Sequence, residues 1–222
     1  GGGAPVYYSP YVFCFHLQEQ ERTMTQSDNR NTSNEGCLKK GDWAIEDIPM
    51  KEALLLVERW HYSKGGALTA CYRHGLINKA SLEVVGVALW MPPTKAAAQC
   101  NYGGDFRKVI TLSRLAIHPD TPKNAASFLL GGSERMIRKD GRFEFLLTYA
   151  DTWQGHTGAI YKATNWDYLG ETKPTEVWVN NEGRMMGKKR GPVNLSKLQM
   201  EEQGFVLQGK FSKHRFGKNL IK

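Results

Sequence analysis

The sequence lacks several features that would define a simple class of protein. No run approaches the roughly 18 to 20 consecutive apolar residues that a membrane-spanning helix needs. The four cysteines, Cys14, Cys37, Cys71 and Cys100, form no Cys-x-x-Cys pair, so they suggest neither a zinc ribbon nor a disulfide framework. The first residues lack the cationic start and the cleavage pattern of a secretory signal. With 41% hydrophobic residues in a chain of 222, we expect a soluble protein with a real core in a reducing compartment.

Acidic residues are scarce in the last forty positions. Between positions 184 and 222 the chain has ten lysines and arginines, opposed only by Glu201 and Glu202. The whole chain has a net charge of +8, so its positive excess is concentrated in this segment. A local positive field favours a polyanionic partner. The alternative is a basic tail that is merely solvated.

The first forty residues differ in composition from the rest. They begin with a glycine- and aromatic-rich stretch and continue into a polar run at 25–36 with almost nothing to bury. We therefore expect residues 1–40 to be a poorly ordered or loosely attached extension, and residues 41–222 to form a single domain.

Hydrophobic periodicity beyond residue 42 predicts alternating helices and strands. Helices are expected over 51–60, 124–139, 158–165 and 194–203. Strands are expected over 68–77, 82–90, 109–117, 143–150, 176–180 and 205–211. This order predicts a mixed α/β (α+β) fold with a central sheet flanked by helices.

The first segment with side chains suited to catalysis is Trp-His-Tyr-Ser-Lys at 60–64, at the end of the first expected helix. His61 is a candidate base or metal ligand at neutral pH, and Tyr62 places a hydroxyl beside it. The alternative is a histidine that caps the helix and is favoured by its dipole.

The second segment is Leu-Ser-Arg-Leu-Ala-Ile at 112–117, followed by a turn and the small residues that open a helix at 124–127. Free backbone N–H groups at such a helix start suit a phosphate or pyrophosphate. The turn has no glycine-rich pattern, so an ordinary strand-to-helix connection is the alternative. Arg114 is interpreted as either a structural or a phosphate-facing cation.

The third segment runs from Tyr149 to Trp166 and includes Asp151, Gly155-His156 and Tyr161. Sites in open α/β folds are built at the carboxyl ends of strands, where Asp151 is expected. Asp151 can orient a histidine, accept a proton or bind a metal, and Tyr161 can donate a proton. The alternatives are a helix cap for Asp151 and a core aromatic for Tyr161.

Taken together, in this order and spacing, the three segments resemble the phage Mom DNA-modification proteins. The resemblance extends from about residue 43 to the C-terminus. It implies a fold similar to the GCN5-related N-acyltransferases, a mixed central sheet flanked by helices that holds an acyl-coenzyme A, such as acetyl-CoA, in a cleft between splayed strands. The sequence departs from that superfamily in one respect, because its usual Arg/Gln-x-x-Gly-x-Gly/Ala phosphate turn is absent.

The resemblance also implies a reaction, which is conversion of adenine in DNA to N6-carbamoylmethyl (acetamido) adenine as protection against restriction. His61, Tyr62, Asp151 and Tyr161 fall on the family's catalytic positions. The implied cofactor contacts are Leu115, Ile117, Asn124 and Ser127. A bound iron with His61 and Asp151 as ligands is a further implication.

The implied partners are double-stranded DNA and a small-molecule group donor, in the cytoplasm of a bacterial host, with no membrane. Trp60, Trp153 and Trp166 are candidates for stacking on an extruded base, although for each of them a place in the core is the favoured alternative. The oligomeric state is left open, a dimer included. Two other functions compete: an N-acyltransferase acting on a protein or small amine, and a non-catalytic DNA-binding module. The expected phosphate contacts are Lys188, Lys189, Arg190, Lys210, Lys213 and Arg215.

Overall fold

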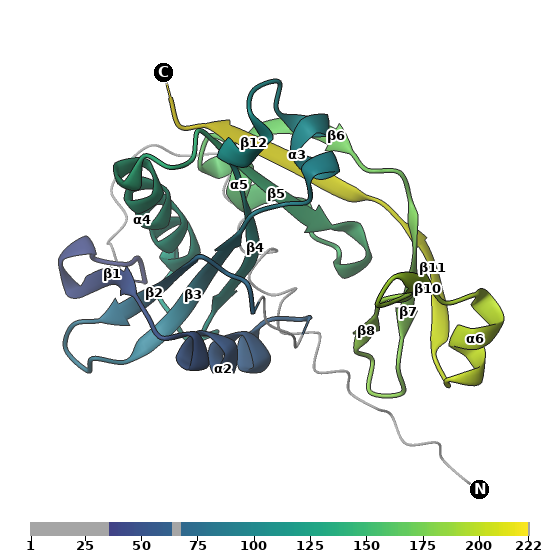
Figure 1. Ribbon diagram of the computed structural model, residues 1–222. Helices are drawn as coiled ribbons and strands as arrows, with labels where there is room; N and C mark the ends of the chain where they lie inside the picture. Colours follow the sequence, from purple (N-terminus) through teal and green to yellow (C-terminus); the bar gives the residue numbers. More distant parts are fainter. Residues whose placement is uncertain (1–35, 64–67, 222) are drawn as a thin grey trace, which may run out of the picture. The chain divides into compact units, whose positions relative to one another are not determined.

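The computed structural model describes residues 36–63 and 68–221 (Figure 1). The expectation of an N-terminal extension concerns residues that lie almost entirely outside this part. No helix of the described part is long and apolar enough to cross a membrane.

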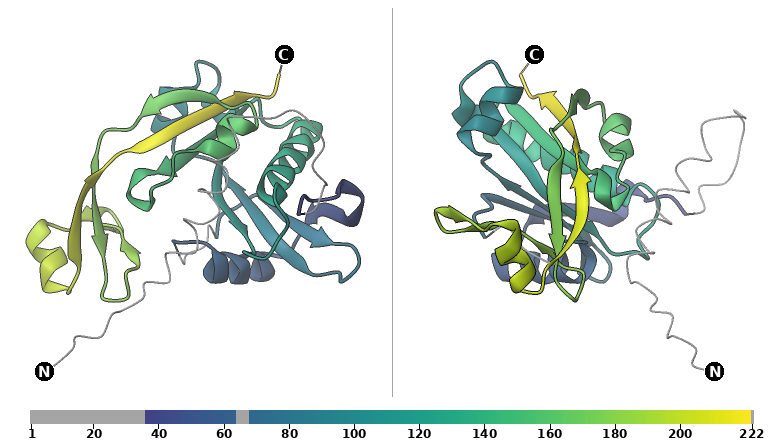
Figure 2. Two further views of the ribbon diagram at one scale, coloured as in Figure 1. Left: turned by 180° about the vertical axis from the view of Figure 1, so that it is seen from behind. Right: turned by 90° about the vertical axis from the view of Figure 1, so that its right-hand side faces the viewer.

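A mixed sheet forms the centre of the fold. In the described residues it has seven strands in the order β1-β2-β3-β4-β5-β12-β6 (Figure 1). Strands β4 and β5 are parallel, whereas every other neighbouring pair in this described sheet is antiparallel. The C-terminal strand β12 lies between β5 and β6, and Figure 2 shows it running beside them. The strands are β1 Trp43–Asp47, β2 Tyr72–Asn78, β3 Val84–Met91, β4 Val109–Ile117, β5 Phe145–Asp151, β6 Asp167–Glu171 and β12 Lys213–Asn219.

Helices α2 and α4 cover opposite faces of this sheet. Successive residues of a strand point to opposite faces. On β3, Val87 and Leu89 pack with α2, whereas Ala88 and Trp90 pack with α4. The sequence therefore reads as a nearly continuous apolar run on β3 because both faces of the strand are covered. The helices are α2 Met50–Trp60, α3 Lys95–Asn101, α4 Ala125–Asp140 and α5 Ala159–Ala163, with short 3-10 turns at Lys40–Asp42, Phe106–Lys108 and Thr152–Gln154.

Strands β4 and β5 separate halfway along their length. In the described part of the chain, their pairing runs from Val109 with Phe145 to Leu112 with Thr148 and then ends. Beyond that point β4 continues to Ile117 and β5 to Asp151. The two carboxyl ends are therefore splayed, as the family resemblance implied.

A β-bulge in β4 lies at the point of separation. Leu112 pairs with Trp90 and Arg114 pairs with Leu89, so Ser113 is an extra residue on β4. An extra residue reverses the side to which the following side chains point. As a result Arg114 and Ala116 face α2, and Leu115 and Ile117 face α4.

An arm at 172–212 interrupts the sheet between β6 and β12. Its described strands form a three-stranded sheet in the order β11-β7-β8, with a short β9–β10 pair and helix α6 (Figure 1). Val177, Trp178, Val179 and Met200 are buried in it. The arm's elements are β7 Thr175–Val179, β8 Met185–Met186, β9 Lys189–Arg190, β10 Val193–Asn194, α6 Lys197–Glu202 and β11 Val206–Phe211.

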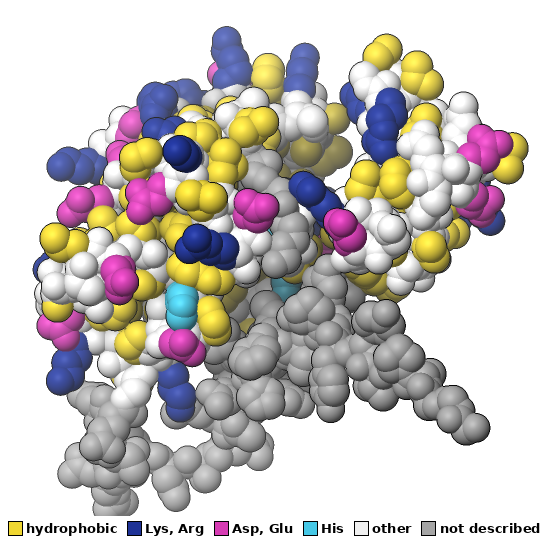
Figure 3. Space-filling view, turned by 90° about the horizontal axis from the view of Figure 1, so that it is seen from below, with side chains coloured by type: hydrophobic (Ala, Val, Ile, Leu, Met, Phe, Trp, Pro, Cys, Tyr) yellow, Lys and Arg dark blue, Asp and Glu magenta, His cyan; other side chains and the backbone are white. Residues whose placement is uncertain are grey.

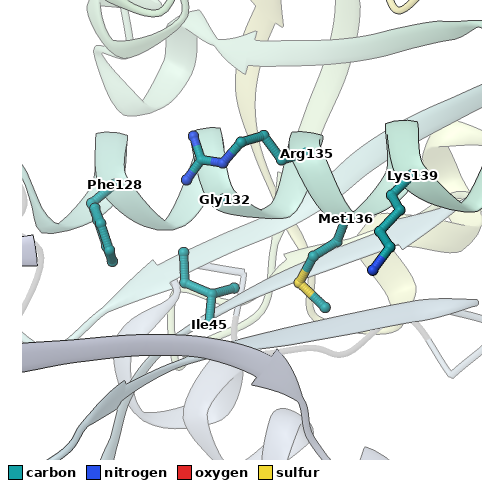
Figure 4. Close-up of a pocket in the computed structure, with 6 residues that line it drawn as sticks. All are labelled: Ile45, Phe128, Gly132, Arg135, Met136 and Lys139. Atoms are coloured by element: carbon teal, nitrogen blue, oxygen red, sulfur yellow. The ribbon is translucent and has the colours of Figure 1, made fainter. Parts of the chain in front are cut away.

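One close approach explains a glycine in the middle of α4. Ile45 of β1 points at the helix where Gly132 stands, and a Cβ at that position would collide with the Ile45 side chain (Figure 4). A small cavity of about 320 Å³ remains beside this contact, with Phe128 and Met136 on its walls. Gly132 therefore allows the edge strand to pack directly on α4 despite its low helix propensity.

Candidate active site

His61 ends α2 and is held in one orientation by its neighbours. Its backbone N–H donates to the Val57 carbonyl at 2.9 Å, and the side chain is 9% exposed. The Ser63 backbone N–H donates to Nδ1 at 3.1 Å, and the Ser63 hydroxyl lies 2.8 Å from the same nitrogen. An N–H donor at Nδ1 requires that nitrogen to be an acceptor, so the proton of the neutral ring is on Nε2.

The surroundings of His61 keep it neutral. Burial, followed by the positive charge of Arg114 and the proximity of His156, lowers its pKa from 6.5 to about 3. A neutral ring whose Nδ1 already accepts a hydrogen bond is a poor base. His61 is better suited to donate a hydrogen bond from Nε2 than to remove a proton.

Tyr62 connects the end of α2 with the loop after β5. Its ring stacks on His61 at 4.4 Å between centroids and meets His156 edge-on at 5.2 Å. Arg114 is close enough for its charge to interact with Tyr62, and it reaches this face of the sheet because of the bulge at Ser113.

Asp151 is the last residue of β5, and its carboxylate is buried with 2% exposure. One oxygen, Oδ1, accepts the Trp153 backbone N–H at 3.1 Å. The other, Oδ2, lies 3.2 Å from Lys213 Nζ, the residue directly opposite on β12. Oδ2 has no hydrogen-bond partner among the described residues, so its contact with Lys213 is an ion pair without hydrogen-bond geometry. A buried carboxylate needs such a cation to remain charged.

His156 lies between this carboxylate and the α2 end. Its backbone N–H donates to the Asp151 carbonyl at 3.1 Å. Burial lowers the pKa of His156, and the nearby Asp151 charge acts in the opposite direction. His61, Tyr62, Arg114, Asp151 and His156 therefore lie together on the α2 face at the splayed strand ends, and we call them the His–Asp cluster.

Tyr161 lies at the point where the strands separate. Its ring packs against Trp166 at 5.5 Å and Phe216 at 5.3 Å, and its hydroxyl shares a hydrogen bond with Thr148. Thr148 is the last residue of β5 that pairs with β4, and it faces away from Asp151. Burial raises the pKa of Tyr161, so its hydroxyl keeps its proton and can donate it.

The four expected cofactor residues lie along the unpaired part of β4 and the start of α4. Leu115 and Ile117 point to the α4 side of β4. Asn124 precedes α4 with a left-handed backbone, at φ 67°, and Ser127 lies in the first turn of the helix. That turn has no acidic residue, so its positive dipole end is not neutralised by a side chain.

The basic side chains predicted to contact DNA differ in their environments. Lys189 and Lys210 are exposed on the arm. Lys188 forms an ion pair with Glu176 at 3.0 Å, and Arg190 donates to the Gly187 carbonyl at 2.7 Å. Lys213 and Arg215 on β12 interact with other residues of the domain. Lys213 forms an ion pair with Asp151, and Arg215 donates hydrogen bonds to Asn101 and to the Leu169 carbonyl.

Trp166 occupies the core, as the favoured alternative had it, whereas the expected metal site needs correction. Trp166 is 4% exposed and donates to the buried Glu134 at 2.7 Å, so it offers no surface for stacking. In the part of the chain that the structure describes, no three His, Cys, Asp or Glu side chains are grouped so that they could hold a metal ion. His61 and Asp151 therefore do not fit the iron site that the sequence suggested.

Sequence reasoning missed two members of the site. His156 was noticed only as part of a motif, although its spacing of five residues from Asp151 places it in the loop that leaves the strand end. Lys213 was assigned to DNA because of its charge. No sequence signal links Lys213 to Asp151, since that contact depends on the register of β12 against β5.

The sheet order, the splayed β4 and β5, and the bulge define a protein with the GCN5-related N-acyltransferase fold. Among solved structures, the ribosomal-protein-S5-alanine acetyltransferase from Vibrio fischeri is similar with a TM-score of 0.50 and 7% identity, over 83% of this chain and 97% of that one. An N-acetyltransferase from Staphylococcus aureus Mu50 is similar with a TM-score of 0.48 and 14% identity, over 81% of this chain and 99% of that one.

Within that fold, the sequence identifies the family. The model of the Mom protein family matches residues 42–218, and the chain belongs to this family. A relative from Escherichia phage Mu, described as the methylcarbamoylase Mom, is 25% identical over 180 residues, which cover 78% of this chain and 73% of the relative.

Proposed function

We propose that this chain is a phage DNA-modification transferase that converts adenine in DNA to N6-carbamoylmethyl adenine. Membership of the Mom family, together with the methylcarbamoylase relative of phage Mu, carries the proposal. The catalytic domain would span 41–222 and act on phage DNA inside the bacterial host, where the product would block restriction enzymes.

The His–Asp cluster can supply the proton transfers that this reaction needs. The adenine amino nitrogen is a weak nucleophile because its lone pair is delocalised into the ring, so it needs a positioned base. His156 is the base in this proposal, because the nearby Asp151 charge favours its protonated form and opposes the effect of burial on its pKa. Neutral His61 and cationic Arg114 would stabilise negative charge that develops on the donor.

Tyr161 would act on the other side of the reacting centre. Its protonated hydroxyl lies at the separation point of β4 and β5 and would donate a proton to the leaving group. The two proton-transfer groups would then face the cleft from different elements, α5 for the acid and the loop after β5 for the base.

The donor would lie in the cleft between the splayed strands. The unpaired edge of β4 at 113–117 and the start of α4 fit an extended acyl-coenzyme A. Transfer from a thioester carbonyl would give an N6-acyl amide, so a carbamoylmethyl product requires a donor whose CH2 carbon bears the leaving group and bonds to the adenine nitrogen as that group departs. Leu115 and Ile117 would line the path of the coenzyme A, and Asn124 and Ser127 would lie at its pyrophosphate. Calorimetric titration of the full chain with acetyl-CoA tests this; absence of binding at millimolar concentrations would reject that donor class.

The target base must leave the duplex before it can reach a buried cluster, at a cost of a few kcal/mol. We propose that the arm holds the DNA backbone through Lys189, Arg190 and Lys210, contacts that provide affinity without sequence preference. Each lost phosphate contact reduces the slope of log affinity against log salt by about 0.9. The double charge reversal Lys189→Glu and Arg190→Glu should therefore weaken duplex binding and flatten that slope by about 2.

Fluorescence anisotropy on a labelled duplex between 50 and 300 mM salt measures both effects. Lys139→Glu, on the exposed side of α4, is the matched control and should change neither strongly. An unchanged slope in the double variant would remove the arm from the DNA contact.

Mass spectrometry of nucleosides from plasmid DNA tests the reaction directly. Bacteria expressing the chain should contain an adenosine species heavier by an acetamido group. Asp151→Asn should abolish that species, because the neutral amide loses the charge that favours protonation of His156, while Trp153 keeps its acceptor. Asp167→Asn, an exposed carboxylate on β6, is the matched control. Full modification by a folded Asp151→Asn variant would remove Asp151 from the mechanism.

A second function is favoured by the fold alone. The chain would then be an N-acyltransferase acting on a protein or a small amine. Transfer of an acetyl group to peptides or polyamines in the presence of acetyl-CoA, with no change in DNA, would support this alternative.

A further inference from the structure

A groove at one end of the sheet lies outside the His–Asp cluster. It has a volume of about 800 Å³, in the range of small-molecule sites, and lies where β1 and β3 begin and β2 and β4 end. Helix α2 supplies one wall and the turn after β4 supplies another. Figure 3 views the molecule from the α2 side and shows hydrophobic side chains gathered around a histidine, with charged groups of both signs beside them. We call this cavity the α2 groove.

Aromatic rings form much of the α2 groove. Trp43 and Trp60 line it, and the Trp60 ring meets the His118 ring edge-on at 4.9 Å between centroids. Leu55 and Leu82 add apolar surface and are 45% and 77% exposed. Half-buried indoles beside exposed leucines are the surface on which a flat, uncharged ring would stack.

The charges around the α2 groove are unfavourable for a phosphate and suitable for an amino group. Glu52, Glu83 and Asp120 line it, and among the described lining residues Arg59 is the one arginine or lysine. A phosphate here would be repelled. An exocyclic amino group, in contrast, can donate hydrogen bonds to a carboxylate such as Glu83.

The groove borders the proposed reaction centre through two segments. Trp60 is followed directly by His61 of the cluster, and His118 directly follows Ile117 at the end of the splayed part of β4. The groove therefore adjoins the two chain segments that lead into the cluster and into the loop before α4.

From these observations we propose that the α2 groove binds an adenine ring, stacked on the Trp60 indole and recognised through its amino group by the carboxylates. The inference rests on the proposed function, in which two molecules carry this ring. One is the extruded adenine of the DNA, and the other is the adenosine end of a coenzyme A. The shared chemistry is the adenine ring, and the experiment must separate the two sources.

Fluorine NMR of the full chain labelled with 5-fluorotryptophan distinguishes the adenine of coenzyme A from the adenine of DNA. The six tryptophan signals are assigned with single Trp→Phe variants. The probes are coenzyme A, 4′-phosphopantetheine (which lacks the adenosine end), an A·T-containing duplex and a G·C-only duplex. We expect the Trp43 and Trp60 signals to shift, while the fully buried Trp90 and Trp178 serve as internal references.

The pattern of shifts identifies the ligand. A response to coenzyme A but not to 4′-phosphopantetheine supports the cofactor's adenine, and a response to the A·T-containing duplex but not to the G·C-only duplex supports the target base. No shift of Trp43 or Trp60 with any probe at saturation overturns the proposal. Equal shifts with and without adenine also overturn it.

Two variants test the recognition itself. Trp60→Ala should weaken binding of the responding probe by between about 5-fold and 150-fold, the range for loss of one base–aromatic stack. Glu83→Gln, a small change at an exposed side chain, should weaken it by roughly tenfold through the lost charge-assisted hydrogen bond. Glu58→Gln, on the exposed side of α2, is the matched control. Unchanged affinity in Glu83→Gln would refute recognition by that carboxylate, even if Trp60→Ala fails to fold.

The outcome is separable from that of the proposed function. Nucleoside mass spectrometry reports modification without reference to the groove. Modified DNA together with unshifted Trp43 and Trp60 signals would reject adenine binding in the groove and leave the proposed reaction standing. A clear adenine response in a chain that leaves DNA unmodified would reject the reaction alone.

Discussion

The pKa of His61 predicts a specific loss of stability in acid. The folded protein holds this histidine neutral, with a pKa of about 3 against an ordinary value of 6.5. Because the pKa is depressed on folding, the unfolded chain binds more protons below pH 6.5, and stability falls as pH decreases from there toward 3. At pH 4.5 the unfolded residue is almost fully protonated and the folded one almost fully neutral. The difference corresponds to about 2.7 kcal/mol.

Urea unfolding at pH 7.5 and at pH 4.5 measures this loss. Other buried groups titrate over the same range, so the decisive quantity is the comparison with His61→Asn. The asparagine Oδ1 can still accept the Ser63 N–H, but it does not titrate. We expect the pH-dependent loss to be smaller in the variant by about 2–3 kcal/mol. Identical losses in the two proteins would show that His61 is protonated without penalty, and the argument that it acts as a neutral donor would fail.

Two further predictions concern the packing that supports the site. Ser133→Ala should lower the free energy of unfolding by about 2–4 kcal/mol, because it leaves the buried Trp90 N–H and His74 Nδ1 without their shared partner. Ser133→Thr, which keeps a hydroxyl, is the control. A loss below about 1 kcal/mol for Ser133→Ala in denaturant unfolding would contradict the prediction. Gly158→Ala should cost about 1–3 kcal/mol, because φ is +73° and a Cβ there would collide with the Phe216 ring; a thermal melting temperature unchanged from wild type would refute it.

The fold was predictable where local signals were strong. The apolar run at 51–60 became α2, the helix expected at 124–139 became α4 and ends at Gly141, and β4 occupies 109–117 as expected. Strands β1, β6 and β12 were not predicted. In β12 the sequence Lys-His-Arg-Phe-Gly-Lys-Asn has only one large apolar residue, Phe216, and its strand conformation comes from pairing with β5 and β6.

The candidate site was predictable as a set of segments but not as a set of contacts. The structure places His61, Tyr62 and Asp151 on one face of the sheet and brings His156 between them, whereas Tyr161 packs on the other face, beside Thr148. The side to which Arg114 points could not be read from alternation, because one extra residue in β4 reverses it. The partner of Asp151 could not be read either, since Lys213 is 62 positions away and reaches it only through strand register.

The arm leaves the domain at Thr172 and rejoins it at Lys213, and these two residues are hydrogen-bonded to each other. The Thr172 N–H donates to the Lys213 carbonyl at 2.9 Å, and the Lys213 N–H donates to the Thr172 hydroxyl at 3.0 Å. These bonds close the base of the excursion, so residues 173–212 can lengthen, shorten or change composition without moving β12 out of register. Lys213 is also the cation that pairs with the buried Asp151. The arm can thus change in length and composition while Lys213 stays in place beside the buried Asp151 carboxylate.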